Sequence, residues 1–126
     1  YWQGVLLVPE RDLLIGRLNG IVAGAAQMVK PPSNNEASFF NVVMISFFVA
    51  PWARGHGMAR GMLIEFEKQA KKLGFTQISL DVRETQDAAI ALYERAGYIR
   101  WSSKEKYARV NGKYIKGYYY TKDLSL

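Results

Sequence analysis

One stretch organises the fold of this chain: Phe47-Phe48-Val49-Ala50-Pro51-Trp52-Ala53-Arg54-Gly55-His56-Gly57-Met58-Ala59-Arg60-Gly61. An apolar and aromatic run ends at Pro51, a short loop with two glycines follows, and a helical pattern then begins. Such a loop is suited to bind an anion, because the N–H groups of the first helical turn are unpaired and the helix dipole adds positive charge. We therefore expect a phosphate or pyrophosphate site here, with Arg54 and Arg60 adding formal charge.

The composition limits the classes of protein to consider. With 126 residues, the chain holds one domain at most. It has no cysteine, which excludes disulfides, thiolate metal sites and a cysteine nucleophile, and its single histidine argues against a histidine-built metal site. No apolar run is long enough to span a bilayer and no signal peptide is visible, so we expect a cytoplasmic protein without a membrane partner. Because the chain starts at Tyr1 rather than Met, we expect it to be part of a longer one.

The formal charge of +6 is unevenly distributed. From Ile99 to Leu126 there are seven lysines and arginines against two acids, Glu105 and Asp123. A basic surface can attract nucleic acid, an acidic protein or an anionic cofactor. These charges are scattered through strand-like sequence and form no dense run, so we expect no nucleic-acid partner.

The hydrophobic pattern predicts a mixed α/β sheet. Asn19-Gly20 lies between two apolar runs and predicts a hairpin, and the run that ends at Val49 is apolar on both faces, as in a central strand. Met58, Met62 and Phe66 recur at helical spacing. Helices that link strands imply parallel pairs, while hairpins add antiparallel ones. The predicted strands are 13–18, 21–29, 37–49, 75–82 and 98–101 with a closing hairpin of 107–110 and 113–122, and the predicted helices are 58–73 and 86–96.

Three kinds of phosphate-binding loop compete at this position. A nucleotide-triphosphate loop requires Gly-Lys-Ser/Thr after the glycines, which is absent, and a dinucleotide fingerprint requires its third glycine one place before Gly61. The third kind fits, because Arg54-x-x-Gly57-x-Ala59 matches the Q/R-x-x-G-x-G/A signature of the GNAT superfamily of N-acetyltransferases. A second block, Leu80-Asp81-Val82-Arg83 followed by Ala88 to Tyr98, resembles the family's LEVR and LYEK-x-GF block. From about Phe39 to Tyr98 the chain thus resembles this family.

The resemblance implies a GNAT-like α/β fold, with a mixed central sheet and helices on both faces. Residues 1–126 would form a single domain that lacks the family's first strand and first helices. The implied activity is transfer of the acetyl group of acetyl-CoA to an amine, on a small molecule or a peptide, by direct attack in a ternary complex. The alternative is a module of the same fold that binds coenzyme A or regulates, with little or no transfer. A homodimer stays open, and no metal is implied.

The resemblance also assigns residues to coenzyme binding. The loop and the helix N-terminus would hold the pyrophosphate, and the splayed end of the long strand would pair with the pantetheine arm. The Val49 N–H would donate to the thioester oxygen. Gln86 stands where the family usually has Asn, and it keeps the amide chemistry one methylene further out. The implied cofactor-binding residues are Phe47, Phe48, Val49, Arg54, Gly55, His56, Gly57, Met58, Ala59, Arg60 and Gln86.

Two residues are candidates for catalysis. Tyr93 falls on the family's general-acid tyrosine, and a phenol stays protonated at neutral pH; the alternative is a core aromatic on its helix. Asp81 stands where some family members have a glutamate general base; the alternative is an acid that pairs with a nearby arginine or caps a neighbour. We expect His56, inside the phosphate loop, to face the phosphate or to be exposed. Five aromatic residues near the end of the chain either line the acceptor side or pack as cross-strand pairs: Tyr107, Tyr114, Tyr118, Tyr119 and Tyr120.

Overall fold

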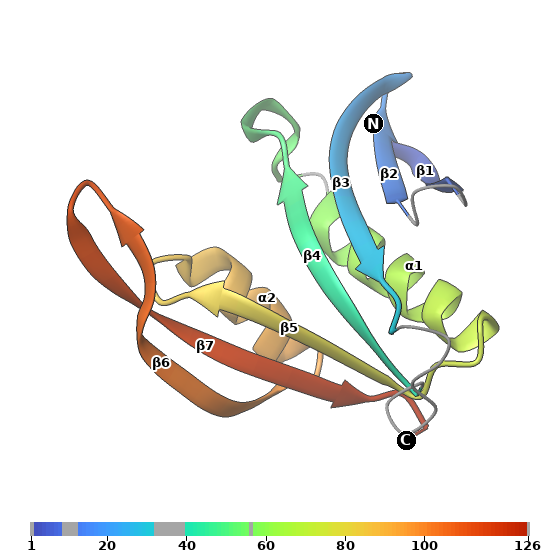
Figure 1. Ribbon diagram of the computed structural model, residues 1–126. Helices are drawn as coiled ribbons and strands as arrows, with labels where there is room; N and C mark the ends of the chain where they lie inside the picture. Colours follow the sequence, from blue (N-terminus) through green and yellow to red (C-terminus); the bar gives the residue numbers. More distant parts are fainter. Residues whose placement is uncertain (1, 9–12, 32–39, 56, 126) are drawn as a thin grey trace.

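The computed structural model describes residues 2–8, 13–31, 40–55 and 57–125, and side chains from residue 13 onwards. One mixed sheet of seven strands carries two helices (Figure 1), which is the α/β architecture that the sequence predicts. In chain order the elements are β1 (Trp2–Val8), β2 (Leu13–Leu18), β3 (Ile21–Val29), β4 (Asn41–Val49), a 3₁₀ turn (Pro51–Ala53), α1 (Met58–Lys72), β5 (Gln77–Arg83), α2 (Asp87–Arg95), β6 (Ile99–Val110) and β7 (Lys113–Asp123).

The strands lie side by side in the order β1-β2-β3-β4-β5-β7-β6. All neighbours pair antiparallel except β4 and β5, which pair in parallel. Asn19 and Gly20 adopt φ values of 54° and 80° in the turn between β2 and β3, as the Asn-Gly hairpin predicts. Strand β1, which pairs with β2, is missing from the sequence predictions, although the apolar run Val5-Leu6-Leu7-Val8 is its signal.

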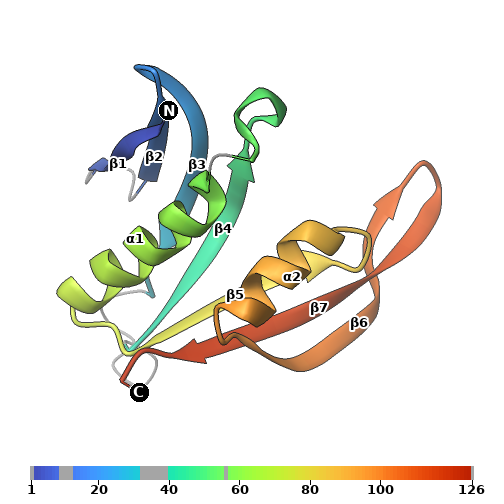
Figure 2. The ribbon, with the colours of Figure 1, turned by 180° about the vertical axis from the view of Figure 1, so that it is seen from behind.

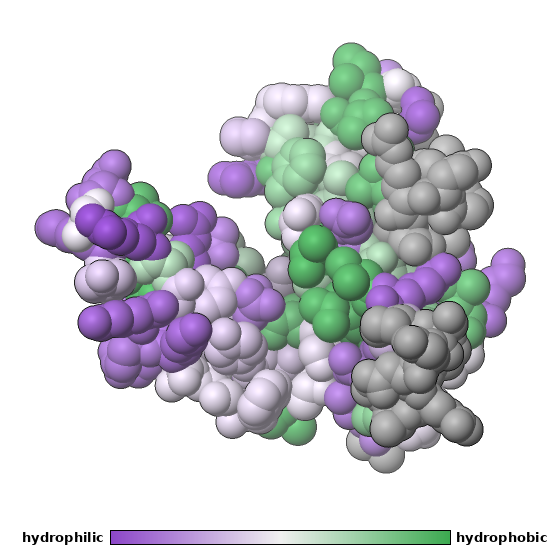
Figure 3. Space-filling view, viewed as in Figure 1, coloured by the Kyte–Doolittle hydropathy of each residue, from purple (hydrophilic) through white to green (hydrophobic). Residues whose placement is uncertain are grey.

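Both helices lie on the same face of the sheet, as two opposite views show (Figures 1 and 2). The sequence predicts helices on both faces, and the connections explain the difference. The crossovers from β4 through α1 to β5, and from β5 through α2 to β6, move in the same direction across the sheet. Right-handed crossovers that move in one direction place their helices on one face. The other face, turned to the viewer in Figures 1 and 3, is covered by neither helix, and we call it the open face.

The buried core lies between the sheet and the two helices. Met62 of α1 packs onto two glycines, Gly16 on β2 and Gly24 on β3. A Cβ atom at these positions would come within 3.0 and 2.8 Å of the Met62 Sδ atom. The missing side chains therefore allow α1, and with it the loop before α1, to lie close to the sheet. The core side chains of α1 and β5 follow the predicted periodicities: Met58, Met62, Leu63, Phe66 and Ala70 on the helix, and Ile78, Leu80 and Val82 on the strand.

The sheet opens between β4 and β5. These two strands pair only over Asn41–Val43 and Gln77–Ser79, and beyond these residues they diverge (Figure 1). The Asn41 side chain reinforces the junction, because its Oδ1 atom accepts hydrogen bonds from Gln77 Nε2 at 3.0 Å and from Ser79 Oγ at 2.8 Å. The far half of β4 therefore has a strand on one side only.

Strands β6 and β7 form a long antiparallel arm (Figure 1). The sequence divides this part into a short strand at 98–101 and a hairpin from 107, whereas the structure joins residues 99–110 into the one strand β6. Its pairing with β7 shifts register twice, between Arg100 and Ser102 and between Lys104 and Ala108. Such irregularities break the alternation of side chains from which a continuous strand is predicted.

Candidate active site

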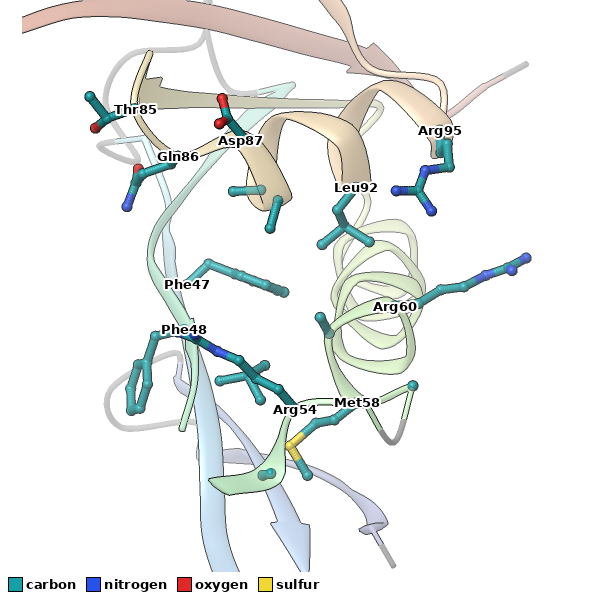
Figure 4. Close-up of a pocket in the computed structure, with 17 residues that line it drawn as sticks. Phe47, Phe48, Arg54, Met58, Arg60, Thr85, Gln86, Asp87, Leu92 and Arg95 are labelled. Atoms are coloured by element: carbon teal, nitrogen blue, oxygen red, sulfur yellow. The ribbon is translucent and has the colours of Figure 1, made fainter. Parts of the chain in front are cut away.

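A pocket of about 800 Å³ lies where β4 and β5 have separated. Its walls come from the end of β4, from the loop and first turn of α1, and from one side of α2 with the turn before it (Figure 4). In Figure 4, Phe47 and Leu92 point into the pocket from opposite sides, and the Phe48 ring points away from it. The described lining residues are Phe47, Phe48, Val49, Ala53, Arg54, Gly55, Gly57, Met58, Ala59, Arg60, Thr85, Gln86, Asp87, Ala88, Ala89, Leu92 and Arg95.

The start of α1 offers backbone donors to this pocket. Gly57, the N-cap residue, has a φ of +72° and Gly55 a φ of +87°, conformations that residues with a side chain rarely adopt. No described side chain caps the helix and its first turn carries no acid, so the N–H groups of Met58, Ala59 and Arg60 are left for a ligand. A Cβ atom added at either glycine would meet nothing within 4 Å, so the space beside these donors is open.

The end of β4 presents a further backbone donor. Ala50 N–H donates to the Ala23 carbonyl of β3 at 2.6 Å. Because successive N–H groups point to opposite sides of a strand, the Val49 N–H points away from β3, towards the side where β5 has separated. A bulge at Ser46, whose φ is +53°, precedes this segment and turns Phe47 towards the helices.

The charge of the lining is positive. Arg54, Arg60 and Arg95 are exposed and lie around the pocket (Figure 4), whereas Asp87 is the one acid among the described lining residues. Fixed positive charge beside unpaired N–H groups favours an anionic ligand. The donor set therefore fits a pyrophosphate, and the apolar side chains of Phe47, Met58 and Leu92 fit an uncharged arm attached to it.

The start of α2 is built differently from that of α1. Gln86 is its N-cap residue and Asp87 brings a carboxylate into its first turn. The Gln86 side chain lines the pocket, and its Oε1 atom accepts a hydrogen bond from the Arg83 backbone N–H at 3.3 Å. The amide thus folds back over the turn that joins β5 to α2.

Tyr93 lies behind the pocket and is outside its described lining. Its ring packs against Phe47, Tyr98 and Tyr120, with centroid distances of 6.1, 5.9 and 6.4 Å, and only 5% of the residue is exposed. Burial raises the pKa of Tyr93 to about 12, and the negative charge of Asp81 contributes to the rise. Phe47 touches Tyr93 and also lines the pocket, so this one ring connects the two.

Asp81 is exposed on β5, at the level where β4 has already diverged, and it is also outside the described lining. Its Oδ2 atom accepts a hydrogen bond from the Tyr107 hydroxyl, and Tyr119 of β7 is its cross-strand neighbour. Burial raises the pKa of Tyr107, and the hydrogen bond and charge of Asp81 raise it further. The sequence offers an arginine as the alternative partner of Asp81, whereas the structure shows a tyrosine.

The other aromatic residues of the arm pack within it. Tyr120 is buried beneath α2, and its hydroxyl donates to Glu94 at 2.7 Å. Arg100 lies over the Tyr118 ring, 3.7 Å from its centroid. Tyr118 and Tyr120 therefore pack within the protein, which is the second of the two roles that the sequence allows for these aromatic residues.

All predicted coenzyme-binding residues that the structure describes line the one pocket; His56 is outside the described residues. The sequence misses the other seven described lining residues: Ala53, Thr85, Asp87, Ala88, Ala89, Leu92 and Arg95. The signal for three of them is the helical spacing of Ala88, Leu92 and Arg95, which places one side of α2 against the pocket. The two candidates for catalysis, Tyr93 and Asp81, lie around this pocket rather than in its described walls.

The described residues contain no group of three or more His, Cys, Asp or Glu side chains arranged to hold a metal ion. Neither of their two helices is long and apolar enough to cross a membrane.

The comparisons with known proteins agree on one family. The model of the acetyltransferase (GNAT) family matches residues 1–98. A relative from Azospirillum brasilense, which carries the name of an uncharacterized N-acetyltransferase in the hisH–hisA intergenic region, is 55% identical over 86 residues. That match covers 68% of this chain and 51% of the relative, so the chain spans about half the length of the curated relative that it matches.

Solved structures share the fold. A GNAT-family acetyltransferase from Streptococcus pneumoniae superposes with a TM-score of 0.83 at 22% identity, covering 92% of this chain and 68% of that one. An N-acetyltransferase from Staphylococcus aureus Mu50 has a TM-score of 0.80 at 19% identity, covering 92% and 69%. An acetyltransferase from Salmonella typhimurium, solved with its cofactor acetyl-CoA, has a TM-score of 0.80 at 20% identity, covering 90% and 65%.

Proposed function

This chain belongs to the GNAT family of acetyltransferases, and from that premise we propose that it transfers the acetyl group of acetyl-CoA to a primary amine. The observation that carries the proposal is the start of α1, where unpaired N–H groups, two glycines with positive φ and three nearby arginines meet at one pocket in the opened sheet. A neighbour of the same fold is solved with acetyl-CoA, which supports the same choice of co-substrate.

The groups of this chain would act at three points. The first-turn N–H groups of α1, with Arg54 and Arg60, hold the pyrophosphate. The Val49 N–H donates to the thioester carbonyl oxygen, where negative charge develops during attack. Asp81 accepts a proton from the acceptor ammonium, directly or through a water molecule. When bound, acetyl-CoA supplies the acetyl group as an activated thioester, and its sulfur leaves as a thiolate.

Tyr93 is proposed to stabilise the leaving sulfur through its hydroxyl. Its pKa of about 12 keeps the phenol protonated at any working pH. A full proton transfer to a thiol of pKa near 8.5 is uphill, by about 5 kcal/mol. The hydrogen bond therefore contributes more than the transfer itself, and Tyr93 is better described as a donor than as a strong acid.

The alternative is a module that binds coenzyme A without efficient transfer. The observation that favours it is the position of the two candidates for catalysis, since Tyr93 and Asp81 are outside the described lining and Asp81 is already engaged by Tyr107.

One experiment separates the two functions. Acetyl-CoA is titrated calorimetrically, and an amine panel is then assayed for released coenzyme A with a thiol reagent, which reads the product without protein background because the chain has no cysteine. Saturable heat together with release is the expected result. Heat without release from any amine favours the binding module, and no heat at millimolar acetyl-CoA contradicts both functions.

A further inference from the structure

The open face carries a cluster that joins one carboxylate to three aromatic rings. Tyr107 donates to the exposed carboxylate of Asp81, and its ring meets the Tyr119 ring edge-on at 6.0 Å between centroids. Trp101 lies 5.8 Å from Tyr119 and is 63% exposed. A carboxylate beside exposed aromatic faces is suited to bind an organic cation, such as a protonated amine.

Gly117 on β7, the strand between β5 and β6, leaves the space that the Tyr107 ring occupies. The ring of Tyr107, from β6, lies over Gly117 of β7 and reaches Asp81 on β5. A Cβ atom at Gly117 would overlap this ring, so only glycine leaves the path open. The hydroxyl of Tyr107 therefore gives Asp81 the hydrogen bond that an ammonium group would give.

Two cations lie on the next row of the same face. Asp81, Tyr119 and Ser102 are neighbours across β5, β7 and β6, and two residues further along these strands Arg83, Gly117 and Lys104 are neighbours in the same way. Residues two apart on a strand share a face and lie roughly 7 Å apart. The positive charge of Arg83 also opposes the rise in the pKa of Tyr107, which places it near the cluster.

The cluster also lies beside the pocket. Asp81 is two residues beyond the last residue of β5 that pairs with β4. Its charge contributes to the raised pKa of Tyr93, which follows first from burial, and Tyr93 packs on the pocket residue Phe47. An amine bound at Asp81 on the open face would thus face the pocket from the side opposite the helices.

Resting on the proposed function, we propose that the acceptor is a peptide amino terminus followed by an acidic residue. The ammonium group of the peptide binds at the Asp81 carboxylate beside these aromatic rings, and the side-chain carboxylate of the next residue pairs with Arg83 and Lys104. The open face favours this class over polyamines, because Arg83 and Lys104 lie in the row next to Asp81, within the hydrophilic surface of the arm (Figure 3), and would repel a second positive charge. Neither helix covers this face (Figure 1), so it also has room for an acceptor as long as a peptide.

Three amidated peptides that begin Ala-Asp, Ala-Asn and Ala-Lys and are otherwise identical test the proposal. Released coenzyme A gives kcat/KM for each peptide. The Asp peptide is expected to exceed the Asn peptide by about tenfold, because it gains two partly exposed ion pairs, and the Lys peptide is expected to be the poorest, because its charge is repelled. In the double variant Arg83→Gln, Lys104→Gln the ratio of Asp to Asn falls to about one.

A matched variant controls for the loss of two charges. Lys68 and Lys71 are exposed on α1, away from the open face, so Lys68→Gln, Lys71→Gln keeps the preference for the Asp peptide. Transfer without a preference for Asp, or a preference that survives in the Arg83, Lys104 variant, overturns this inference alone. Acetyl-CoA heat with transfer to other amines but to none of the peptides also overturns it alone. Absence of acetyl-CoA heat overturns the proposed function, and the inference with it.

Discussion

Two helices begin at the same pocket, and they begin with opposite chemistry. α1 starts at Gly57 with no acid in its first turn and with Arg54 and Arg60 beside it, whereas α2 starts at Gln86 and brings Asp87 into its first turn. An acid in the first turn already interacts with the helix dipole, and a first turn without one leaves that dipole to a ligand. The difference indicates that the phosphates of a ligand belong at α1 and its uncharged arm nearer to α2.

The largest effect on acetyl-CoA binding is expected from an acid placed at the start of α1, where the phosphates would bind. Gly57→Glu places a carboxylate at the N-cap, and repulsion of the pyrophosphate is expected to weaken acetyl-CoA binding by about 100-fold or more in calorimetry. Gly112→Glu is the matched control, because Gly112 also has a positive φ, of 76°, and open space around it, but lies in the turn of the arm. Equal losses in both variants would mean that backbone strain, not charge, weakens binding.

The inner side of α2 is tested by Tyr93→Phe. Loss of the hydroxyl is expected to lower kcat by about 10- to 100-fold while acetyl-CoA affinity stays nearly constant, because Tyr93 is outside the described lining of the pocket. Steady-state kinetics and calorimetry measure the two effects separately. Tyr114→Phe, at an exposed tyrosine of the arm, serves as the control. An unchanged kcat would remove Tyr93 from the mechanism.

Because the pKa of Tyr93 is raised, the free energy of unfolding is expected to fall at alkaline pH. The folded-state pKa of Tyr93, about 12, lies above the ordinary tyrosine value of 10.0, so the contribution of Tyr93 to stability is fully present below pH 10 and is lost as the pH rises from 10 towards 12. This loss amounts to at most about 3 kcal/mol in the free energy of unfolding. Urea unfolding at pH 8 and at pH 11 measures it. Tyr93→Phe should lose less stability over this range than the unchanged protein; an equal loss would contradict the assignment.

The smallest effect is expected from removing the acid of α2. Asp87→Asn relieves repulsion of an anionic ligand and should raise acetyl-CoA affinity about threefold at low salt, with less change at high salt. Glu105→Gln removes an acid of equal charge from the arm and should leave affinity unchanged. If Asp87→Asn weakened binding instead, the Asp87 carboxylate would act on the ligand as a hydrogen-bond acceptor and not as a repulsive charge.

The sequence predicts the local features of this molecule well. The Asn19-Gly20 turn, the stripe of α1 and the strand β5 follow from short-range periodicity, and the structure confirms them. The residues predicted to bind coenzyme gather at one pocket because most of them lie along a single strand, loop and helix, where sequence order sets spatial order.

Features that depend on distant strands could not be predicted in this way. The contact of Tyr107 with Asp81 spans three strands and depends on the two register shifts of β6 and on the absence of a side chain at Gly117. The common face of the two helices depends on the strand order, in which β7 lies between β5 and β6. A pattern of single residues contains neither the register nor the order.

The three-residue junction of β4 and β5 leaves the two parts of the sheet, β1 to β4 and β5 to β7, with little direct backbone pairing between them. The Asn41 side chain bridges the junction, and α1 adds a second connection, because Glu67 accepts hydrogen bonds from the Tyr98 hydroxyl and from Lys122 Nζ, both at 3.0 Å. Amide hydrogen exchange should accordingly be faster at this junction than within β2–β3 or β5–β7, and a ligand that spans both parts should slow it.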